Sequence, residues 1–289
     1  MSRSSWVVVC WSQRFVMVDV PPPDPNVSAN SKTALENLQQ QVQQQLKYIQ
    51  NQRQQLQDLR ERIGQLENLL PYVQYRPEIQ WLMENKSERM DPTVPIFDSG
   101  RADFHLDRYV FAASYCRNLR VADIACGTGY GSEHLKKVGG ASRVVGVDIC
   151  PEAIQYASTQ HGGEGLDFRN APGETTGLED ASIDVVVSFE TIEHVPDDRA
   201  LLAEFARILA PGGRLVCSTP NLWPLAIAPH HVREYDRQQF VSVLQSHFVV
   251  LELWNQNSGT SFEFNRQQPR GIVPTTDDNH QLAECFLAI

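Results

Sequence analysis

Apolar residues recur with a seven-residue period between Leu35 and Leu70. Nine of the eleven a and d positions in this stretch are apolar, and the two exceptions are both glutamines. Such a heptad repeat predicts a coiled-coil helix, here over residues 33–70, and its β-branched a positions favour parallel two-stranded pairing. We therefore expect a homo-oligomer held by this helix, the alternative being a Gln-rich low-complexity segment with accidental periodicity. The a positions are Leu35, Val42, Ile49, Leu56, Ile63 and Leu70, and the d positions are Leu38, Gln45, Gln52, Leu59 and Leu66.

Beyond residue 100 the pattern changes to short apolar runs that alternate with helical stretches. This alternation predicts a doubly wound parallel sheet with helices on both faces, whose ligands bind at the carboxyl ends of the strands. The predicted strands are Val121–Ile124, Val144–Val147, Leu166–Arg169, Ile183–Ser188, Arg214–Ser218 and Phe248–Leu253. The predicted helices are His105–Cys116, Ser132–Val138, Pro151–Gln160 and Arg199–Leu209.

Prolines mark the expected domain boundaries. The Pro-rich stretch at residues 21–25 separates the first residues from the heptads, and Pro71 is expected to end the helix. The sequence thus predicts a disordered extension over 1–32, the coiled-coil helix over 33–70, a linker over 71–100 and a globular domain over 101–289.

Composition narrows the possible partners and compartments. The formal net charge of −10 disfavours nucleic-acid binding, because an acidic surface repels phosphate groups. The six cysteines show no CxxC spacing, which argues against a zinc ribbon or a disulfide scaffold and fits a cytoplasmic location. No apolar run approaches the ~20 residues that a transmembrane helix needs.

A glycine-rich turn follows the first predicted strand of the domain. The segment Asp123-Ile-Ala-Cys-Gly127-Thr-Gly129 leads into a helix, where backbone amides can approach a ligand closely. Asp148 ends the next predicted strand, and a carboxylate there can accept both ribose hydroxyls of a nucleoside. Because the carboxylate of Asp123 would repel a pyrophosphate, the pattern favours a cationic nucleoside.

At this point the sequence resembles the class I S-adenosylmethionine (SAM) dependent methyltransferases. The resemblance covers about residues 100–289 and implies a seven-stranded Rossmann-like sheet whose seventh strand is antiparallel, with residues 247–254 and 283–289 as the last hairpin. It implies that Gly127 and Gly129 lie against the methionine moiety and that Asp148 holds the ribose. It also implies Asp123 near the cofactor amino group and Asn170 at the adenine.

Two further segments resemble subfamilies of these enzymes. Residues 105–109, His-Leu-Asp-Arg-Tyr, are similar to the lid helix of glycan-pathway methyltransferases, which implies that Arg108 pairs with the cofactor carboxylate. A surface cation is the alternative for Arg108. The stretch around His231-Val-Arg-Glu-Tyr235 resembles both the glycan-pathway enzymes and the metal-dependent small-RNA 2′-O-methyltransferases.

The fourth predicted strand of the parallel sheet is followed by Glu190, Glu193 and His194 in an E-x-x-E-H pattern. Two carboxylates and an imidazole on one helical turn suit a divalent cation such as Mg²⁺ or Mn²⁺. The resemblance to the RNA enzymes and to ubiquinone-pathway O-methyltransferases implies His231 as a further ligand. Without a metal, His194 or His231 would act as a base or line the pocket, and Glu190 would cap a helix or bind the lid arginine and thereby the cofactor.

The function that these features predict is SAM-dependent O-methylation of a sugar, glycan or small-molecule hydroxyl. A hydroxyl is a poor nucleophile at neutral pH, so a bound cation or a histidine base would assist it. The alternatives are metal-free methylation of a small molecule or lipid intermediate, and a coiled-coil scaffold with an inactive methyltransferase fold.

Overall fold

A computed structural model describes the chain in two compact units, Met1–Leu70 and Pro71–Ile289. The described residues are 5–11, 14–20, 29–75, 81–82, 84, 90–94, 99–222, 230–259 and 268–289.

The first unit begins with two antiparallel strands. Strand β1 (Ser5–Trp11) pairs with β2 (Arg14–Val20), with Ser5 opposite Val20 and Trp11 opposite Arg14. The structure differs here from the disorder expected over residues 1–32. Both segments are rich in valine and aromatic residues, which favour strand pairing.

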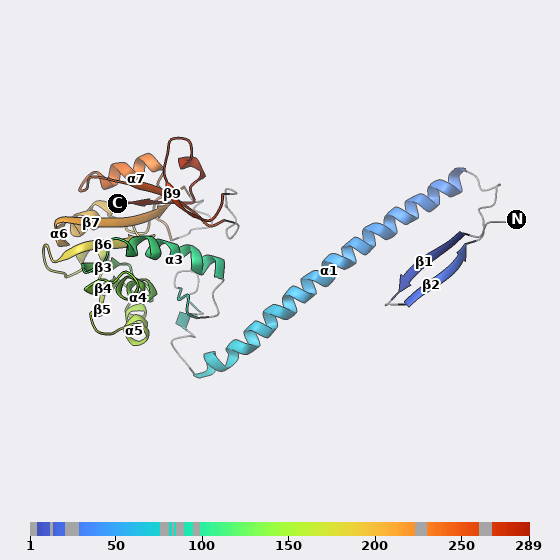
Figure 1. Ribbon diagram of the computed structural model, residues 1–289, viewed down its shortest axis with the longest axis horizontal. Coiled ribbons are helices and arrows are strands. Elements are labelled where there is room, and N and C mark those ends of the chain that lie inside the picture. Colours follow the sequence, from blue (N-terminus) through green and yellow to red (C-terminus); the bar gives the residue numbers. More distant parts are fainter. Residues whose placement is uncertain are drawn as a thin grey trace. The chain divides into compact units, whose positions relative to one another are not determined.

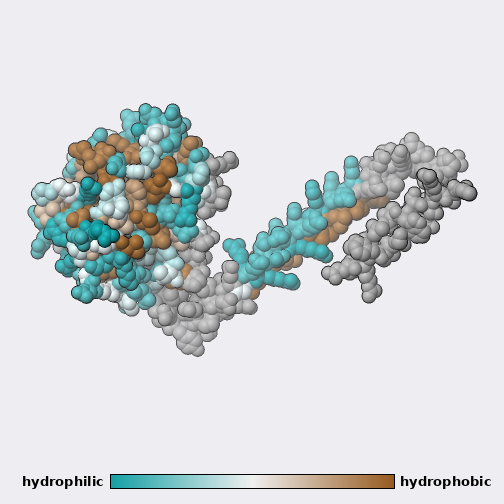
Figure 2. Space-filling view, in the orientation of Figure 1, coloured by the Kyte–Doolittle hydropathy of each residue, from teal (hydrophilic) through white to brown (hydrophobic). Residues whose placement is uncertain are grey.

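Helix α1 (Ala29–Tyr75) follows and carries the heptad repeat. It continues to Tyr75, past Pro71, where we expect it to end; the proline, which has no N–H to donate, costs the helix a backbone hydrogen bond without ending it. The apolar residues along one side of its described part are 47–57% exposed and form a continuous stripe in Figure 2. They are Leu38, Val42, Leu46, Ile49, Leu56, Leu59 and Ile63.

The second unit contains an eight-stranded sheet in the order β5-β4-β3-β6-β7-β10-β8-β9 (Figure 1). Its five parallel strands are β3 (Arg120–Ile124), β4 (Arg143–Asp148), β5 (Leu166–Asn170), β6 (Ile183–Phe189) and β7 (Leu209–Pro220). The antiparallel part consists of β8 (Leu253–Asn257), β9 (Gly271–Pro274) and β10 (Cys285–Ala288). The doubly wound class is confirmed, with one strand more than the seven expected, because β9 pairs with β8 at the edge.

Strand β8 starts later than the sequence pattern indicates. The prediction was Phe248–Leu253, yet Val249 and Leu251 are 80% and 66% exposed and lie outside the strand. The strand runs instead through Asn255 and Gln256, whose buried side chains are hydrogen-bonded: Gln256 Nε2 donates to the carbonyl of Phe104 at 2.6 Å, and Asn255 Nδ2 donates to that of Asn279 at 2.9 Å. The strand predicted from hydropathy alone is therefore wrong by about five residues, because the buried residues of β8 include hydrogen-bonded polar side chains.

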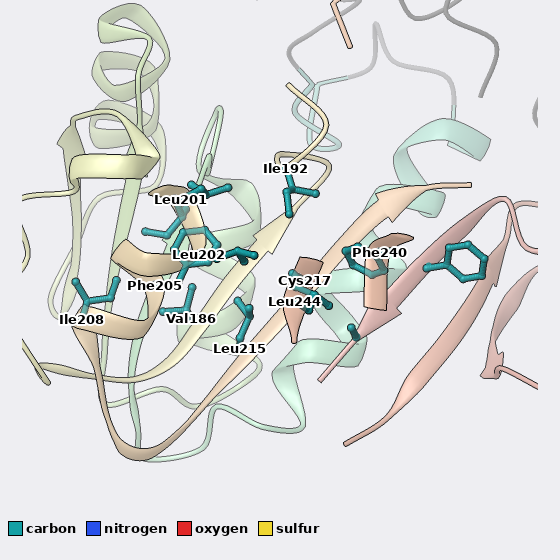
Figure 3. Packing of buried hydrophobic residues seen from close by; sticks show 14 of the residues in the cluster. Val186, Ile192, Leu201, Leu202, Phe205, Ile208, Leu215, Cys217, Phe240 and Leu244 are labelled. Carbon is teal, nitrogen blue, oxygen red and sulfur yellow. The ribbon is translucent and has the colours of Figure 1, made fainter. Parts of the chain in front are cut away.

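Helices cover both faces of the sheet. Helices α6 (Asp198–Ile208) and α7 (Arg237–Leu244) bury Leu201, Phe205 and Phe240 against one face (Figure 3). Helices α3 (Ser99–Ala113) and α4 (Tyr130–Lys137) cover β3, β4 and β6 on the other, and α5 (Pro151–Gln160) lies over β4 and β5. Short 3-10 turns occur at Gly173–Thr175 and His280–Leu282.

Part of the expected linker over residues 71–100 belongs to the packed domain. Leu82 and Asp91 are fully buried, and Leu82 packs with Tyr156 of α5. Within the described part of the chain, no helix is both long and apolar enough to cross a membrane.

The close approach of α3 to α4 yields a prediction about Gly131. A Cβ atom at Gly131 would overlap the ring of Tyr109, whereas one at Gly163 would meet open space. Gly131→Ala should therefore lower the free energy of unfolding by about 1–3 kcal/mol, the usual cost of overpacking. Urea denaturation measures this, with Gly163→Ala as control; equal stability of the two variants would contradict the packing described.

Candidate functional site

The glycine turn at the end of β3 lies against the end of β4. The Gly127 amide donates to Asp148 Oδ2 at 2.9 Å, and the Cys126 amide donates to the carbonyl of Val147 at 3.0 Å. Because the two strands are parallel neighbours, their carboxyl ends meet at one edge of the sheet. The predicted proximity of glycine turn and acidic strand end is therefore present.

The two expected ligand glycines occupy different surroundings. Both have positive φ angles, 55° at Gly127 and 87° at Gly129, which glycine adopts without strain. A Cβ on Gly127 would meet no atom within 4 Å, whereas one on Gly129 would lie 2.7 Å from both Ala157 and Phe168. Gly127 thus faces open space, and Gly129 allows the turn to pack on α5 and β5.

Asp148 is held rigidly at the strand end. Its Oδ1 accepts from the Cys150 amide at 2.9 Å while Oδ2 accepts from Gly127. Each carboxylate oxygen has a second lone pair, so the ionised group can accept further hydroxyl donors. Asn170 Nδ2 donates to the backbone carbonyl of Asp148 at 2.9 Å, which leaves Asn170 Oδ1 as the atom suited to a ligand amine.

Asp123 is fully buried beneath the turn. Its carboxylate accepts from Ser132 Oγ at 2.6 Å and from Tyr109 Oη at 3.3 Å, and so connects β3 to α3 and α4. Burial raises the pKa of Asp123 to about 7, although these two hydrogen bonds act in the opposite direction. Both carboxylate oxygens thus have partners within the protein.

Arg108 of α3 and Glu190 after β6 form a buried ion pair. Arg108 Nη1 lies 2.6 Å from Glu190 Oε1, and the Ser218 hydroxyl, at the end of β7, donates to the same oxygen at 2.8 Å. Arg108 is 1% exposed, which rules out the surface-cation alternative. The charge of Glu190 raises the pKa of Arg108 in spite of its burial, and the Cys285 thiol lies 3.6 Å from Glu190 Oε2. Glu190 therefore binds the lid-helix arginine.

A second cluster combines Glu193, His194 and His231. One ligand atom from each of the three lies within 4.8 Å of the others, and the two imidazole rings meet edge to face with centroids 4.7 Å apart. Glu190 is not part of this group, so the structure brings together three of the four predicted metal ligands. The cluster forms because the turn after β6 meets residues 230–235: the Val232 amide donates to the backbone carbonyl of Glu193 at 2.9 Å.

Glu193 is fully buried. Its Oε2 accepts from Thr219 Oγ1 at 3.2 Å, but its Oε1 has no hydrogen-bond partner among the described residues. Burial, together with the charge of Glu190, raises the pKa of Glu193 well above its ordinary value. A cation beside Oε1 would compensate this buried carboxylate.

Hydrogen bonds orient both histidines of the cluster. His194 Nδ1 donates to the backbone carbonyl of His230 at 3.1 Å, and His231 Nδ1 lies 2.6 Å from Glu234 Oε1. With Nδ1 as the donor, the neutral imidazole carries its lone pair on Nε2. A hydrogen-bond acceptor at the other ring nitrogen is the usual arrangement around metal-binding histidines, and it equally suits a histidine that takes up a proton.

Several contributors were not identified from the sequence. Ser132, Ser218 and Thr219 each donate a hydroxyl to a buried carboxylate, and single serines or threonines in a strand or helix give no pattern that would indicate this. Glu234 is oriented towards His231, and the i, i+3 spacing of the two residues was the available signal.

Comparisons with known proteins agree with this geometry. Residues 122–217 match a family described as a methyltransferase domain. Over 124 residues the chain is 36% identical to a ubiquinone biosynthesis O-methyltransferase of Cereibacter sphaeroides, covering 42% of this chain and 49% of that protein. Over 144 residues it is 31% identical to a probable S-adenosylmethionine-dependent methyltransferase of Mycolicibacterium smegmatis, covering 48% and 54%. The chain thus spans about half the length of the curated relatives it matches.

Two solved structures share the fold. A putative methyltransferase in complex with the Trm112 methyltransferase activator of Haloferax volcanii aligns with a TM-score of 0.53 at 21% identity, covering 65% of this chain and 90% of that one. A SAM-dependent methyltransferase of Thermotoga maritima, a possible histamine N-methyltransferase, aligns with a TM-score of 0.51 at 16% identity, covering 65% and 88%. At these identities the likeness concerns the fold alone.

The raised pKa of Asp123 predicts a pH-dependent stability. Its folded-state pKa of about 7 lies above the ordinary 3.8. The contribution of Asp123 to the free energy of unfolding is therefore fully present below pH 4 and is lost as the pH rises through 7. The unfolding free energy of the wild type, minus that of Asp123→Asn, should fall by up to about 1.4 kcal/mol per pH unit in this window. Urea titrations of both proteins between pH 4 and 8 measure this difference; a constant difference would show that Asp123 is not the titrating group.

Proposed function

We propose that this chain, which carries a class I SAM-dependent methyltransferase domain, is an O-methyltransferase that acts on a hydroxyl of a sugar, glycan or other small molecule. The observation that carries the proposal is the Glu193–His194–His231 cluster. Glu193 lies three residues after Glu190, the partner of Arg108, in the segment that follows β6. Among the curated relatives, the proteins of Cereibacter sphaeroides and Xanthomonas oryzae are named as O-methyltransferases of ubiquinone biosynthesis, which favours oxygen as the methyl acceptor.

In this proposal, residues at the carboxyl ends of β3, β4 and β5 form the part of the site that binds SAM. Asp148 would accept the ribose hydroxyls, Gly127 would allow the cofactor to approach the backbone, and Asn170 Oδ1 would accept from the adenine amine. The Arg108–Glu190 pair offers one charge of each sign, which suits the carboxylate and ammonium of an amino acid. SAM supplies a methyl group that its sulfonium makes strongly electrophilic.

The chain's own part in the reaction is to position the hydroxyl and remove its proton. His194 Nε2 lies 4.0 Å from Glu193 Oε1, and in both rings the lone pair is on Nε2 because Nδ1 donates. Either Nε2 can take up a proton from an acceptor hydroxyl. Asp123 is enclosed by Ser132 and Tyr109, so we assign it to the support of the glycine turn.

The same cluster fits a divalent cation. Its donor set of one carboxylate and two imidazoles, with the unsatisfied Glu193 Oε1 among them, suits a first-row transition metal with open positions, so it favours Mn²⁺ over Mg²⁺, which prefers oxygen ligands. A bound cation would lower the pKa of the acceptor hydroxyl and orient it. Glu193, His194 and His231 would be its ligands, and Glu234 would fix the ring of His231.

The charge balance bears on the acceptor. A net charge of −10 disfavours an acceptor that carries many phosphates, which supports a saccharide or another small hydroxyl compound over RNA.

We propose in addition that α1 pairs two copies of the chain as a parallel coiled coil, because its apolar stripe is half exposed along the described helix.

The function can be tested by methyl transfer from labelled SAM to a panel of sugars, nucleotide sugars, catechols and amines. We expect transfer to hydroxyl acceptors, loss of most turnover on chelation and recovery with Mg²⁺ or Mn²⁺. Glu193→Gln should lower turnover at least about a hundredfold while SAM affinity measured by calorimetry changes little. The exposed Glu152→Gln serves as control.

Two results would contradict this proposal. Absence of SAM binding would argue against an enzyme, and transfer to amines alone would argue against an O-methyltransferase. Full activity of Glu193→Gln in the presence of a chelator would remove the metal from the proposal and leave the histidines as bases.

The coiled coil can be tested in the full chain. Leu56→Asp places a charge on the apolar stripe and should weaken self-association at least about tenfold, because a buried leucine contributes about 1.5–3 kcal/mol. Gln50→Asp introduces the same residue beside the stripe and should leave association unchanged. Sedimentation equilibrium measures both; an unchanged dimer in Leu56→Asp would place the interface elsewhere.

A further inference from the structure

Residues Met90–Val94, which we call the strap, lie outside the part of the chain that matches the methyltransferase family. We expected them in a linker, yet Met90 is 6% exposed and Asp91 is fully buried. The strap contacts the glycine turn on one side and the end of α5 on the other. It therefore connects two elements of the domain that are distant from it in sequence.

The contact with the turn is made by Thr128, the residue between the two glycines. Its hydroxyl donates to the backbone carbonyl of Met90, and its side chain is 1% exposed. The turn contains three residues with positive φ, namely Ala125 at 63° as well as Gly127 and Gly129. A backbone of this kind persists only where surrounding contacts hold it, and the Thr128 hydrogen bond supplies one such contact.

The strap is anchored by a buried carboxylate–imidazole–carboxylate arrangement. Asp91 Oδ2 lies 3.1 Å from His161 Nε2, and Glu133 Oε2 of α4 lies 3.0 Å from His161 Nδ1. The Tyr156 hydroxyl of α5 also donates to Asp91 Oδ2 at 2.9 Å, while Oδ1 accepts from Thr93. With a carboxylate at each ring nitrogen, an imidazolium satisfies both acceptors at once, and its position at the end of α5 adds a favourable helix-dipole interaction.

We propose that the strap is a positioning element for the cofactor turn, with Asp91 and His161 as positioning residues that act through the Met90 carbonyl and Thr128. The proposal rests on SAM being the ligand of the turn. It assigns a role to residues that precede the matched domain, and it explains why a carboxylate is buried at Asp91: the charge of His161 and the hydroxyl of Tyr156 compensate it.

The arrangement has a defined pH dependence. Burial opposes protonation of His161, yet the hydrogen bonds and charges of Asp91 and Glu133 outweigh it and raise the pKa of His161 above its ordinary value. The groups that face the ring are Asp91 from the strap, Glu133 with its partner Lys137 from α4, and Tyr156 from α5. The anchor is therefore complete below pH 6.5 and weakens as the pH rises through the raised pKa.

The first experiment separates the hydroxyl of Thr128 from its size. Calorimetric titration with SAM should show about tenfold weaker binding for Thr128→Val, and near wild-type binding for Thr128→Ser. Asp91→Asn should weaken binding to a similar extent, and the exposed Asp167→Asn serves as control for removal of a carboxylate from the same domain. A SAM affinity of Thr128→Val within twofold of that of the wild type would overturn the proposal. The comparison of the two Thr128 variants tests the proposal even if Asp91→Asn fails to fold.

The second experiment uses the pH profile, which a purely structural contact would not change. The SAM affinity of the wild type relative to His161→Gln should be highest at pH 6 and should decline towards pH 8.5. A ratio that stays constant over this range would overturn the role of His161.

The failure of the proposed function would look different. If the wild type bound no SAM, the cofactor assignment would fall, and hydrogen exchange of the amides at residues 126–131 would still test the strap. Faster exchange at these amides in Thr128→Val than in Thr128→Ser supports the strap as a positioning element, and equal exchange contradicts it.

Discussion

The hydrogen bond from the Gly127 amide to Asp148 joins the ends of two neighbouring parallel strands and determines where a ligand can bind. It directs the carboxylate to the edge of the sheet and holds the turn in a left-handed conformation that leaves Gly127 open to space. The surrounding contacts keep this turn in place: Gly129 packs on Phe168, and Thr128 reaches the strap. The nucleoside site that we propose here is thus a consequence of parallel pairing between β3 and β4.

Buried charges follow the same edge of the sheet, and they are compensated to different degrees. Glu190 is paired with Arg108 and also accepts from the Ser218 hydroxyl. Glu193, three residues further along, accepts from the Thr219 hydroxyl, and its second oxygen lies 4.0 Å from His194 Nε2. Burying a carboxylate costs free energy unless a cation or donors compensate it, so Glu193 is the less compensated of the two carboxylates, and this is why we propose the reactive role for its cluster.

The two units of the chain obey different constraints. The domain buries its apolar residues between the sheet and its helices, with Phe205 and Phe240 almost or fully inaccessible. Helix α1 keeps an apolar stripe half exposed over the length for which its side chains are described, which a single helix in water does not stabilise. This exposed stripe is the reason that we propose association for the first unit and not for the second.

The class of fold, the strand positions β3 to β6, helix α5 and the pairing of Gly127 with Asp148 followed from local sequence patterns, because hydrophobic period and turn chemistry are short-range properties. The position of β8 did not, since Asn255 and Gln256 are buried only by virtue of partners at Asn279 and Phe104. The residues of the E-x-x-E-H pattern are evident in the sequence. That Glu190 pairs with Arg108, whereas Glu193 and His194 join His231, was decided by the tertiary structure. Which carboxylate lies beside the Arg108 guanidinium and which beside an imidazole depends on where α3 and residues 230–235 pack against the end of β6. The spacing of residues along one turn carries no information about neighbours so distant in the sequence.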